Sequence, residues 1–510
     1  MRNRNDCGIC EYIPLKSLVE NNGWRYAAVI FTVLLFTTIA LLLLLWLAPA
    51  NELVQFNLAD DAVYLTNAFD LGLGRFRTSE WGPLYSLFIR AQAVFVADPI
   101  QLFIVNGVLV QACYIGLIGA VVYQACRSAS LALLVGLLFI WGGQLQVVPA
   151  VNYFSASICL IGVLATARAK TGVIAAITWS WIIYLLTFVR LEFFVSLLLV
   201  LALLLFATVG QWRSGPLVAL GGKSGCAALG LLVLCFLSIR FPWPDGDRSW
   251  MAFGQHYAFN VHDATGGRAN WLLEWEAVVS ADFGDARGFL SAITHNPQMF
   301  LWHVGMNLLR LLDAFFAMFR SIGGHWLLVL YSLVIIVWLL IGAQRGKLTE
   351  RANGSWLKMI LPLPLLIPPA VSIILVFPRD HYLILLYALM VAVLAVWLGA
   401  RIKLNRRHDI VLFCLGVIVA LSLDSPIKPA SQAMVDDLKL LRSYGMERPI
   451  GALLDASWTR CTFLPTCTRL YPVAQKEPIN LAAVDSIIVS KELDFAAYRQ
   501  VGLAEILRAP

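Results

Sequence analysis

YAAVIFTVLLFTTIALLLLLWL, residues 26–47, is an apolar run without a single charge, and it is long enough for a helix to cross the hydrocarbon core of a membrane. The rest of the chain has the same character, because 60% of its 510 residues are hydrophobic and only 14% are charged. An ordinary globular domain has about 25% charged residues, so this composition indicates a protein that lives in lipid. We therefore predict an α-helical polytopic membrane protein, since a β-barrel would show shorter, alternating segments.

Span-length apolar runs recur along a membrane domain that we place at residues 26–424. We predict eleven transmembrane helices, which lie near residues 26–47, 100–122, 130–146, 150–167, 172–189, 191–209, 224–240, 326–342, 358–377, 382–400 and 410–424. The run at 300–320 resembles a twelfth span, which is left open. Because it contains His303, Arg310 and Asp313, we interpret it as an amphipathic helix at the interface or in a cavity wall.

The sidedness follows from Lys and Arg, which stay on the cytoplasmic side when they lie near the ends of spans. Basic residues collect in the tail 1–25 and in alternate connections, whereas the short opposite connections carry only Arg190 and Arg379. We predict a multi-pass protein of the bacterial inner membrane with a cytoplasmic N-terminus and a periplasmic C-terminus. The net charge of +7 then belongs to loops that face anionic headgroups, and it requires no nucleic-acid partner.

This topology leaves three long segments on the outer face, at 48–99, 241–325 and 425–510. The last resembles a small soluble α/β domain, because "IGALLD" (450–455) and "SIIVS" (486–490) have strand length and lie between helix-like stretches. Cys461 and Cys467 fall in this outer domain, where an oxidising compartment permits the disulfide that we predict between them.

The most informative polar feature lies in the first outer segment, VQFNLADDAVYLTNAFD, residues 54–70. Asp60 and Asp61 open a predicted surface helix, where the helix dipole favours carboxylates and one of them can cap free amides. Capping needs one aspartate, so the second suggests a chemical role. A Gly-Pro break then opens a second apolar helix that carries Tyr85.

At these residues the chain resembles the GT-C superfamily of membrane glycosyltransferases, which includes O-mannosyltransferases, aminoarabinose transferases and arabinofuranosyltransferases. The resemblance consists of the Asp60–Asp61 pair with the nearby Tyr64, followed by the Pro83-Leu84-Tyr85 entry into the next helix. It extends loosely to the layout of many spans and a small outer C-terminal domain. It implies transfer of a sugar from a polyprenyl-phosphate donor to a hydroxyl of a glycan, glycolipid or protein acceptor.

The chemistry of such a transfer fits the residues. A carboxylate base, Asp60 or Asp61, takes the proton of the acceptor as it attacks opposite the leaving group, which gives an inverting reaction. Cations near the outer interface then stabilise the phosphate that leaves. The candidates for phosphate binding are Arg379, His381, Arg190 and Arg75, and those for binding the acceptor or sugar are Tyr64, Tyr85, Glu192, His262 and Asp263.

Several alternatives stay open at this point. A divalent cation (Mg, Mn or Ca) held by Asp60 or Asp61 could bridge to the phosphate, although the sequence does not demand one. A structural ion pair is an equal interpretation of Arg190 and Glu192. A lipid-linked glycan ligase or polymerase would use Arg and His of the late outer loop instead. A transporter or flippase would show internal repeats, and none is seen in the sequence.

Overall fold

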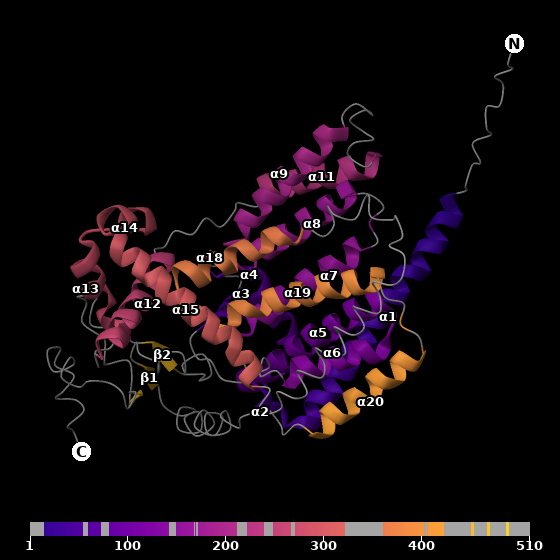
Figure 1. Cartoon of the computed structure of the whole chain (residues 1–510), viewed down its shortest axis with the longest axis horizontal. Coiled ribbons are helices and arrows are strands. Elements are labelled where there is room, and N and C mark those ends of the chain that lie inside the picture. The colour runs from indigo at the N-terminus through magenta and orange to yellow at the C-terminus, as the bar shows by residue number, and fades with distance from the viewer. Residues whose placement is uncertain are drawn as a thin grey trace, which may run out of the picture.

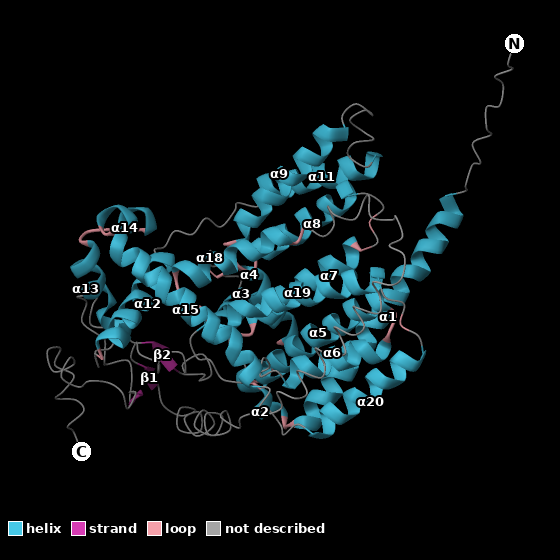
Figure 2. Cartoon of the chain, in the orientation of Figure 1, coloured by secondary structure: helices cyan, strands magenta, loops and turns pink. Residues whose placement is uncertain are grey.

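A computed structural model gives the fold of the chain. It describes residues 15–54, 60–72, 81–141, 149–167, 169, 172–211, 222–238, 248–266, 271–321, 361–401, 404, 406–422, 450–452, 467–469 and 486–488. Helices make up almost all of this part, as Figure 2 shows. The prediction of a mainly α-helical chain is confirmed.

Each predicted span coincides with helical structure, except the one near 326–342, which lies outside the described residues. The helices in question are α1 (Leu15–Leu47), α5 (Pro99–Cys126), α6 (Ala129–Trp141), α7 (Val151–Thr166), α8 (Gly172–Thr187), α9 (Phe193–Gln211), α11 (Gly222–Ser238), the 3-10 turn η4 (Leu363–Leu366) with α18 (Ile367–Leu375), α19 (Asp380–Arg401) and α20 (Arg406–Ser422). They form the elongated body of the molecule in Figure 1.

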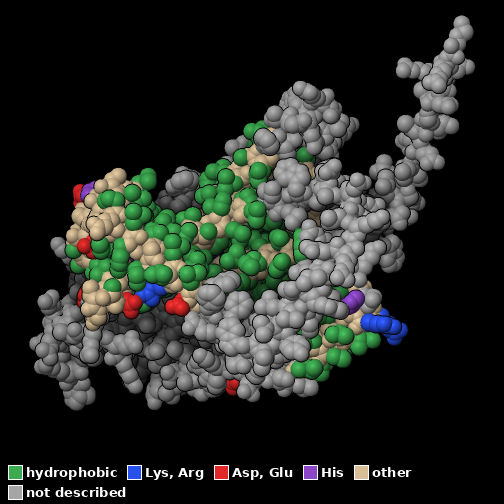
Figure 3. All heavy atoms as spheres, in the orientation of Figure 1, with side chains coloured by type: hydrophobic (Ala, Val, Ile, Leu, Met, Phe, Trp, Pro, Cys, Tyr) green, Lys and Arg blue, Asp and Glu red, His purple; other side chains and the backbone are tan. Residues whose placement is uncertain are grey.

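Three stretches of helix in the described part are long and apolar enough to cross a membrane: Ala27–Leu47, Pro99–Cys126 and His381–Gly399. Shorter apolar helices accompany them, and Figure 3 shows hydrophobic side chains covering the middle of the face in view, with few charges among them. These apolar helices indicate a membrane protein. The count of eleven spans is not established by helix length and stays a prediction.

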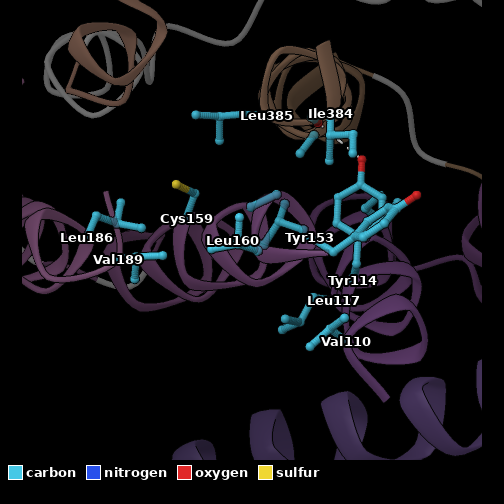
Figure 4. Packing of buried hydrophobic residues seen from close by; sticks show 14 of the residues in the cluster. Val110, Tyr114, Leu117, Tyr153, Cys159, Leu160, Leu186, Val189, Ile384 and Leu385 are labelled. Carbon is cyan, nitrogen blue, oxygen red and sulfur yellow. Dashed lines mark hydrogen bonds between the residues drawn. The ribbon is translucent and has the colours of Figure 1, made fainter. Parts of the chain in front are cut away.

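Helix α5 lies at the centre of the bundle and packs against α1, α6, α7 and α19. Close approach is allowed where α5 carries glycine: a Cβ on Gly116 would lie 2.5 Å from the Cα of Thr37 in α1. On the opposite side, the Tyr114 hydroxyl donates to the carbonyl of Ile384 in α19 at 3.2 Å. Figure 4 shows this bond beside Tyr153 of α7, so three helices meet at one buried pair of tyrosines.

The first segment that we predict on the outer face, 48–99, contains three short helices, α2 (Ala50–Leu53), α3 (Asp60–Gly72) and α4 (Pro83–Gln92). Both predicted helices of this segment are therefore confirmed, with the aspartate pair in the first turn of α3 and a proline at the start of α4. Ala62, Leu65 and Ala68 of α3 are buried in the main hydrophobic core. Helix α3 is thus packed against protein along one side.

The second segment that we predict on the outer face, 241–325, contains α12 (Arg248–Thr265), α13 (Trp271–Phe283), α14 (Phe289–His295) and α15 (Pro297–Ser321), which gather at one end of the molecule in Figure 1. They share a separate hydrophobic core built around Phe253, Tyr257 and Phe283. Within this segment the sequence predicts a helix only at 300–320, where α15 lies. Helices α12 to α14 were not predicted, because polar and apolar residues are mixed in them and they contain no long apolar run.

Helix α15 buries two polar side chains on one side and exposes several leucines on the other. His303 and Asn307 are fully buried against α12 and the end of α18, whereas the leucines of the opposite side are exposed, namely Leu301, Leu308, Leu309 and Leu312. Exposed leucines are expected where a helix borders lipid. This arrangement agrees with the predicted amphipathic helix at the interface or in a cavity wall.

The outer C-terminal segment contains a three-stranded parallel sheet in the order β2-β1-β3, formed by β1 (Ile450–Ala452), β2 (Cys467–Arg469) and β3 (Ser486–Ile488). Strands β1 and β3 fall in the two predicted strand segments. The helices predicted around them lie outside the described residues, as does Cys461, so the α/β domain and the disulfide stay predictions.

Candidate active site

The ends of several helices meet at one edge of the bundle and bring most of the predicted site residues together. The start of α3 supplies Asp60 and Asp61, and the junction between α8 and α9 supplies Arg190 and Glu192. The first turn of α7 and the start of α19 complete the group. Residues separated by more than 300 positions in the sequence therefore surround one small region.

The two aspartates differ sharply in environment. Asp61 is only 4% exposed, and both of its carboxylate oxygens accept from the amide of Ala150, at 3.0 and 3.2 Å. Burial raises the pKa of Asp61 well above its usual range, and the nearby charge of Asp60 raises it further, while the Ala150 amide lowers it. Asp60 is half-buried and retains access to solvent.

Arg190 contacts several of the other residues at this site. Its Nε lies 2.5 Å from a carboxylate oxygen of Glu192, and its Nη1 donates to Oδ1 of Asn152 at 2.7 Å. Burial works to lower the pKa of Arg190, but the net shift is upward, because Glu192 and, more weakly, Tyr382, Tyr64 and lastly Asp60 raise it. Asp60 is therefore close enough for its charge to be felt at the guanidinium.

The start of α19 covers the other side of Arg190. The guanidinium lies over the ring of Tyr382, 5.5 Å from its centroid, which is the geometry of a cation–π contact. Next to it, His381 is buried with its ring centroid 4.3 Å from that of Tyr382. His381 is thus at the edge of the group.

Tyr64 and Tyr85 form a buried pair of rings near the two aspartates. Their ring centroids are 5.1 Å apart in an edge-to-face arrangement, and both side chains are at most 2% exposed. The hydroxyl of Tyr64 donates to the carbonyl of Val189 at 3.4 Å, and that of Tyr85 accepts from Asn106 at 2.6 Å. The structure thus places both tyrosines at the predicted site, with their hydroxyls engaged in internal contacts; sugar binding by either stays a prediction.

Arg379 lies in the turn between α18 and α19 and contacts α12. Its Nη2 lies 2.7 Å from Nε2 of His256 in α12, and the His256 ring stacks on Phe377 with centroids 4.7 Å apart. Burial, the charge of Arg379 and that of His303 lower the pKa of His256 to about 3, so His256 is neutral and accepts the hydrogen bond. The ion pairs found among the described side chains are Arg190–Glu192, His295–Asp285 and Arg310–Asp263, and they do not include Arg379.

The position of this turn is fixed from α15. The last carbonyls of a helix need partners, and here the side chains of α15 provide them. Asn307 donates to the carbonyls of Ile374 and Val376 at 3.0 and 3.2 Å, and Nε2 of His303 lies 3.2 Å from the carbonyl of Leu375. The side chains of α15 therefore hold the end of α18, and Arg379 lies in the turn that follows.

Two other predicted residues lie further along α12. Asp263 forms a salt bridge with Arg310 of α15, whose guanidinium also lies over the rings of Phe259 and Phe377. His262 is half-buried. These residues join the side of the site that carries Arg379, not the side that carries Asp60; a sugar-binding role stays a prediction.

Arg75 lies outside the described residues. Within the described part of the chain, no group of three or more His, Cys, Asp or Glu side chains is arranged to hold a metal ion. A divalent cation at Asp60 or Asp61, which the sequence permits but does not demand, stays one of the open alternatives.

No family model, no curated protein and no solved structure matches this chain.

Three residues of the site were not predicted from the sequence: Asn152, Tyr382 and His256. Tyr382 had a local signal, since it directly follows the predicted His381. Asn152 and His256 had none, because each acquires its role from a partner far away in the sequence, Arg190 in one case and Arg379 in the other.

Proposed function

We propose that this chain is an inverting membrane glycosyltransferase, which moves a sugar from a polyprenyl-phosphate donor to an acceptor hydroxyl on the periplasmic face of a bacterial inner membrane. The observation that carries the proposal is the half-buried carboxylate of Asp60, whose charge acts on the buried guanidinium of Arg190 where the ends of several apolar helices meet. This region contains Arg190 and Arg379, which the distribution of basic residues assigns to the outer side.

Asp60 is the general base of the proposed reaction. The acceptor oxygen forms a bond to the anomeric carbon while its proton passes to Asp60, and the bond from that carbon to the phosphate oxygen breaks with its electron pair. Asp61 is unsuited to this task, because its carboxylate is buried and both oxygens are already bound by an amide. The contrast between the two environments supports one base and not two.

Arg379 is the ligand that we propose for the phosphate of the donor. A phosphate gains charge as the bond to the sugar breaks, and a guanidinium stabilises that charge through paired hydrogen bonds. The described partner of Arg379 is the neutral ring of His256, and none of the ion pairs among the described side chains includes Arg379. Arg190 is already paired with Glu192, and its role is to shape the surroundings of Asp60.

The decisive test replaces Asp60 in the full-length protein. Comparison of surface glycans from cells with and without the protein first names the sugar that is missing, and transfer is then measured with the corresponding polyprenyl-phosphate donor in vesicles. Asp60→Asn keeps the size of the side chain but cannot accept the proton, so we expect kcat to fall by about 100-fold to 10,000-fold.

Asp70→Asn is the matched control, since Asp70 lies on the same helix at its other end. It should retain transfer activity. Full activity of Asp60→Asn would refute the assignment of the base, and unchanged surface glycans in cells that lack the protein would refute the proposed activity.

A further inference from the structure

Asp61 belongs to a closed ring of contacts that none of the chemistry above requires. Its carboxylate holds the amide of Ala150, just before the first turn of α7. Two residues later, Oδ1 of Asn152 accepts from Arg190. The carbonyl of the residue before Arg190, Val189, accepts from Tyr64, which lies one helical turn after Asp61 on α3. The path thus returns to the helix on which it began.

Each link of this ring has a definite physical purpose. The first amides of a helix have no partner within it, and α7 has no side-chain cap of its own, so Asp61 satisfies a donor that would otherwise be unpaired. The amide of Asn152 is oriented as well, because its Nδ2 donates to the carbonyl of Pro149 at 3.1 Å, which leaves Oδ1 free to face Arg190.

The spacing of the two residues on α3 explains how one helix controls two loops. Positions i and i+3 lie on the same side of a helix, so Asp61 and Tyr64 point in the same direction, and both are buried. Asp61 reaches the start of α7, and Tyr64 reaches the junction between α8 and α9. The hydrogen bond from Arg190 to Asn152 ties those two loops to each other.

We propose that Asp61, Tyr64 and Asn152 are positioning residues, which clamp the start of α7 to the α8–α9 junction and so fix Arg190 relative to Asp60. This inference rests on the proposed function only for its effect on transfer, because the clamp itself is a matter of structure. It gives the second aspartate of the pair a purpose different from that of the first. Asp60 reacts, and Asp61 holds the surrounding loops in place.

The test compares two replacements of Asp61 that differ in one property. Asp61→Asn retains an oxygen that can accept from the Ala150 amide, and it resembles the uncharged acid that the buried site favours. Asp61→Ala removes the acceptor. In the full-length protein in vesicles, hydrogen exchange of the amides at 150–154 should become at least about tenfold faster in Asp61→Ala and change less than about threefold in Asp61→Asn.

Transfer kinetics provide the second measurement. Displacement of catalytic groups by about 1 Å costs on the order of 100-fold in rate, so Asp61→Ala should lose about that much kcat, and Asp61→Asn should recover most of it. The pH dependence of kcat should keep the shape of the unaltered protein in both, because Asp60 remains the base. Asp60→Asn should leave hydrogen exchange at α7 unchanged.

The two measurements separate the possible failures. If exchange at α7 is the same in Asp61→Ala and in the unaltered protein, the clamp is wrong, whatever the activity. If Asp61→Asn is as inactive as Asp61→Ala while Asp60→Asn is active, Asp61 is the base and the inference is overturned. If the unaltered protein transfers no sugar, the proposed function falls, and the exchange data alone decide on the clamp.

Discussion

At the scale of single residues, the two arginines at the site differ in the groups that lie next to their positive charges. Arg190 has a carboxylate at 2.5 Å and an amide oxygen at 2.7 Å, whereas Arg379 meets a neutral imidazole. A guanidinium that keeps its full charge attracts anions more strongly than one that is already paired. The difference supports the separate roles that we propose for these two arginines.

Arg379→Ala should therefore act mainly on the donor. Loss of a hydrogen bond to a charged group costs about 1.5–3 kcal/mol, so we expect kcat/KM for the donor to fall roughly tenfold to 100-fold, with little change in the KM of the acceptor. Steady-state kinetics with each substrate varied in turn measure this.

His256→Glu adds a complementary prediction, because it places a carboxylate where Arg379 now meets a neutral ring. The kcat/KM for the donor should fall in His256→Glu although Arg379 is present. In His256→Gln, which keeps an uncharged hydrogen-bond acceptor, it should fall much less. Equal loss in both variants would show that the charge of Arg379 does not matter.

At the scale of elements, α4 and the α8–α9 junction touch backbone to backbone. The amide of Leu84 donates to the carbonyl of Phe188 at 2.8 Å, and a Cβ on Gly82 would lie 2.2 Å from that same oxygen. This contact brings the start of α4 beside the residues that precede Arg190. Glycine is required here for space and not for an unusual backbone angle, since its φ is −57°.

Gly82→Ala should consequently push the two elements apart. Overpacking of this kind costs about 1–3 kcal/mol, and the strain falls next to Val189, so both thermal stability and transfer should decrease. Gly230→Ala in α11 is the matched control, because a Cβ there meets nothing within 4 Å. A thermal unfolding series in detergent would contradict this picture if both variants melted at the same temperature.

The sequence predicts elements of this chain well where polarity alone decides them. An apolar run such as residues 100–122 can only be a buried or lipid-facing helix, and α5 forms there. Helix α12 shows the opposite case, because its hydrophobic residues serve a small separate core and are mixed with His256, Asn260 and Asp263. Its place against α15 depends on contacts that periodicity does not encode.

The candidate site was predictable to a similar degree. Asp60, Arg190 and Glu192 stood out because charges are costly near apolar helices, and the structure brings them together. The difference in environment between Asp60 and Asp61 was not predictable. It depends on the backbone amide of Ala150, and a backbone amide leaves no mark in a sequence.

At the scale of the whole molecule, the orientation in the membrane follows from basic loops and can be tested directly. We expect a cysteine in place of the highly exposed Asp285, between α13 and α14, to react with a membrane-impermeant thiol reagent in intact spheroplasts. A cysteine in place of Arg127, between α5 and α6, should react only after the membrane is opened. Both variants are made in a background without native cysteines, and the reverse pattern would contradict the predicted orientation.

The ring that runs through Asp61, Ala150, Asn152, Arg190, Val189 and Tyr64 has a consequence for how mutants of this protein are interpreted. Opening a closed ring at any one link releases the same constraint, so a second opening has little left to release, and losses from double mutants fall short of the sum. A survey by activity alone would score every member as essential. It would count as many catalytic residues as there are links, although in the reaction that we propose only Asp60, which lies outside the ring, accepts the proton.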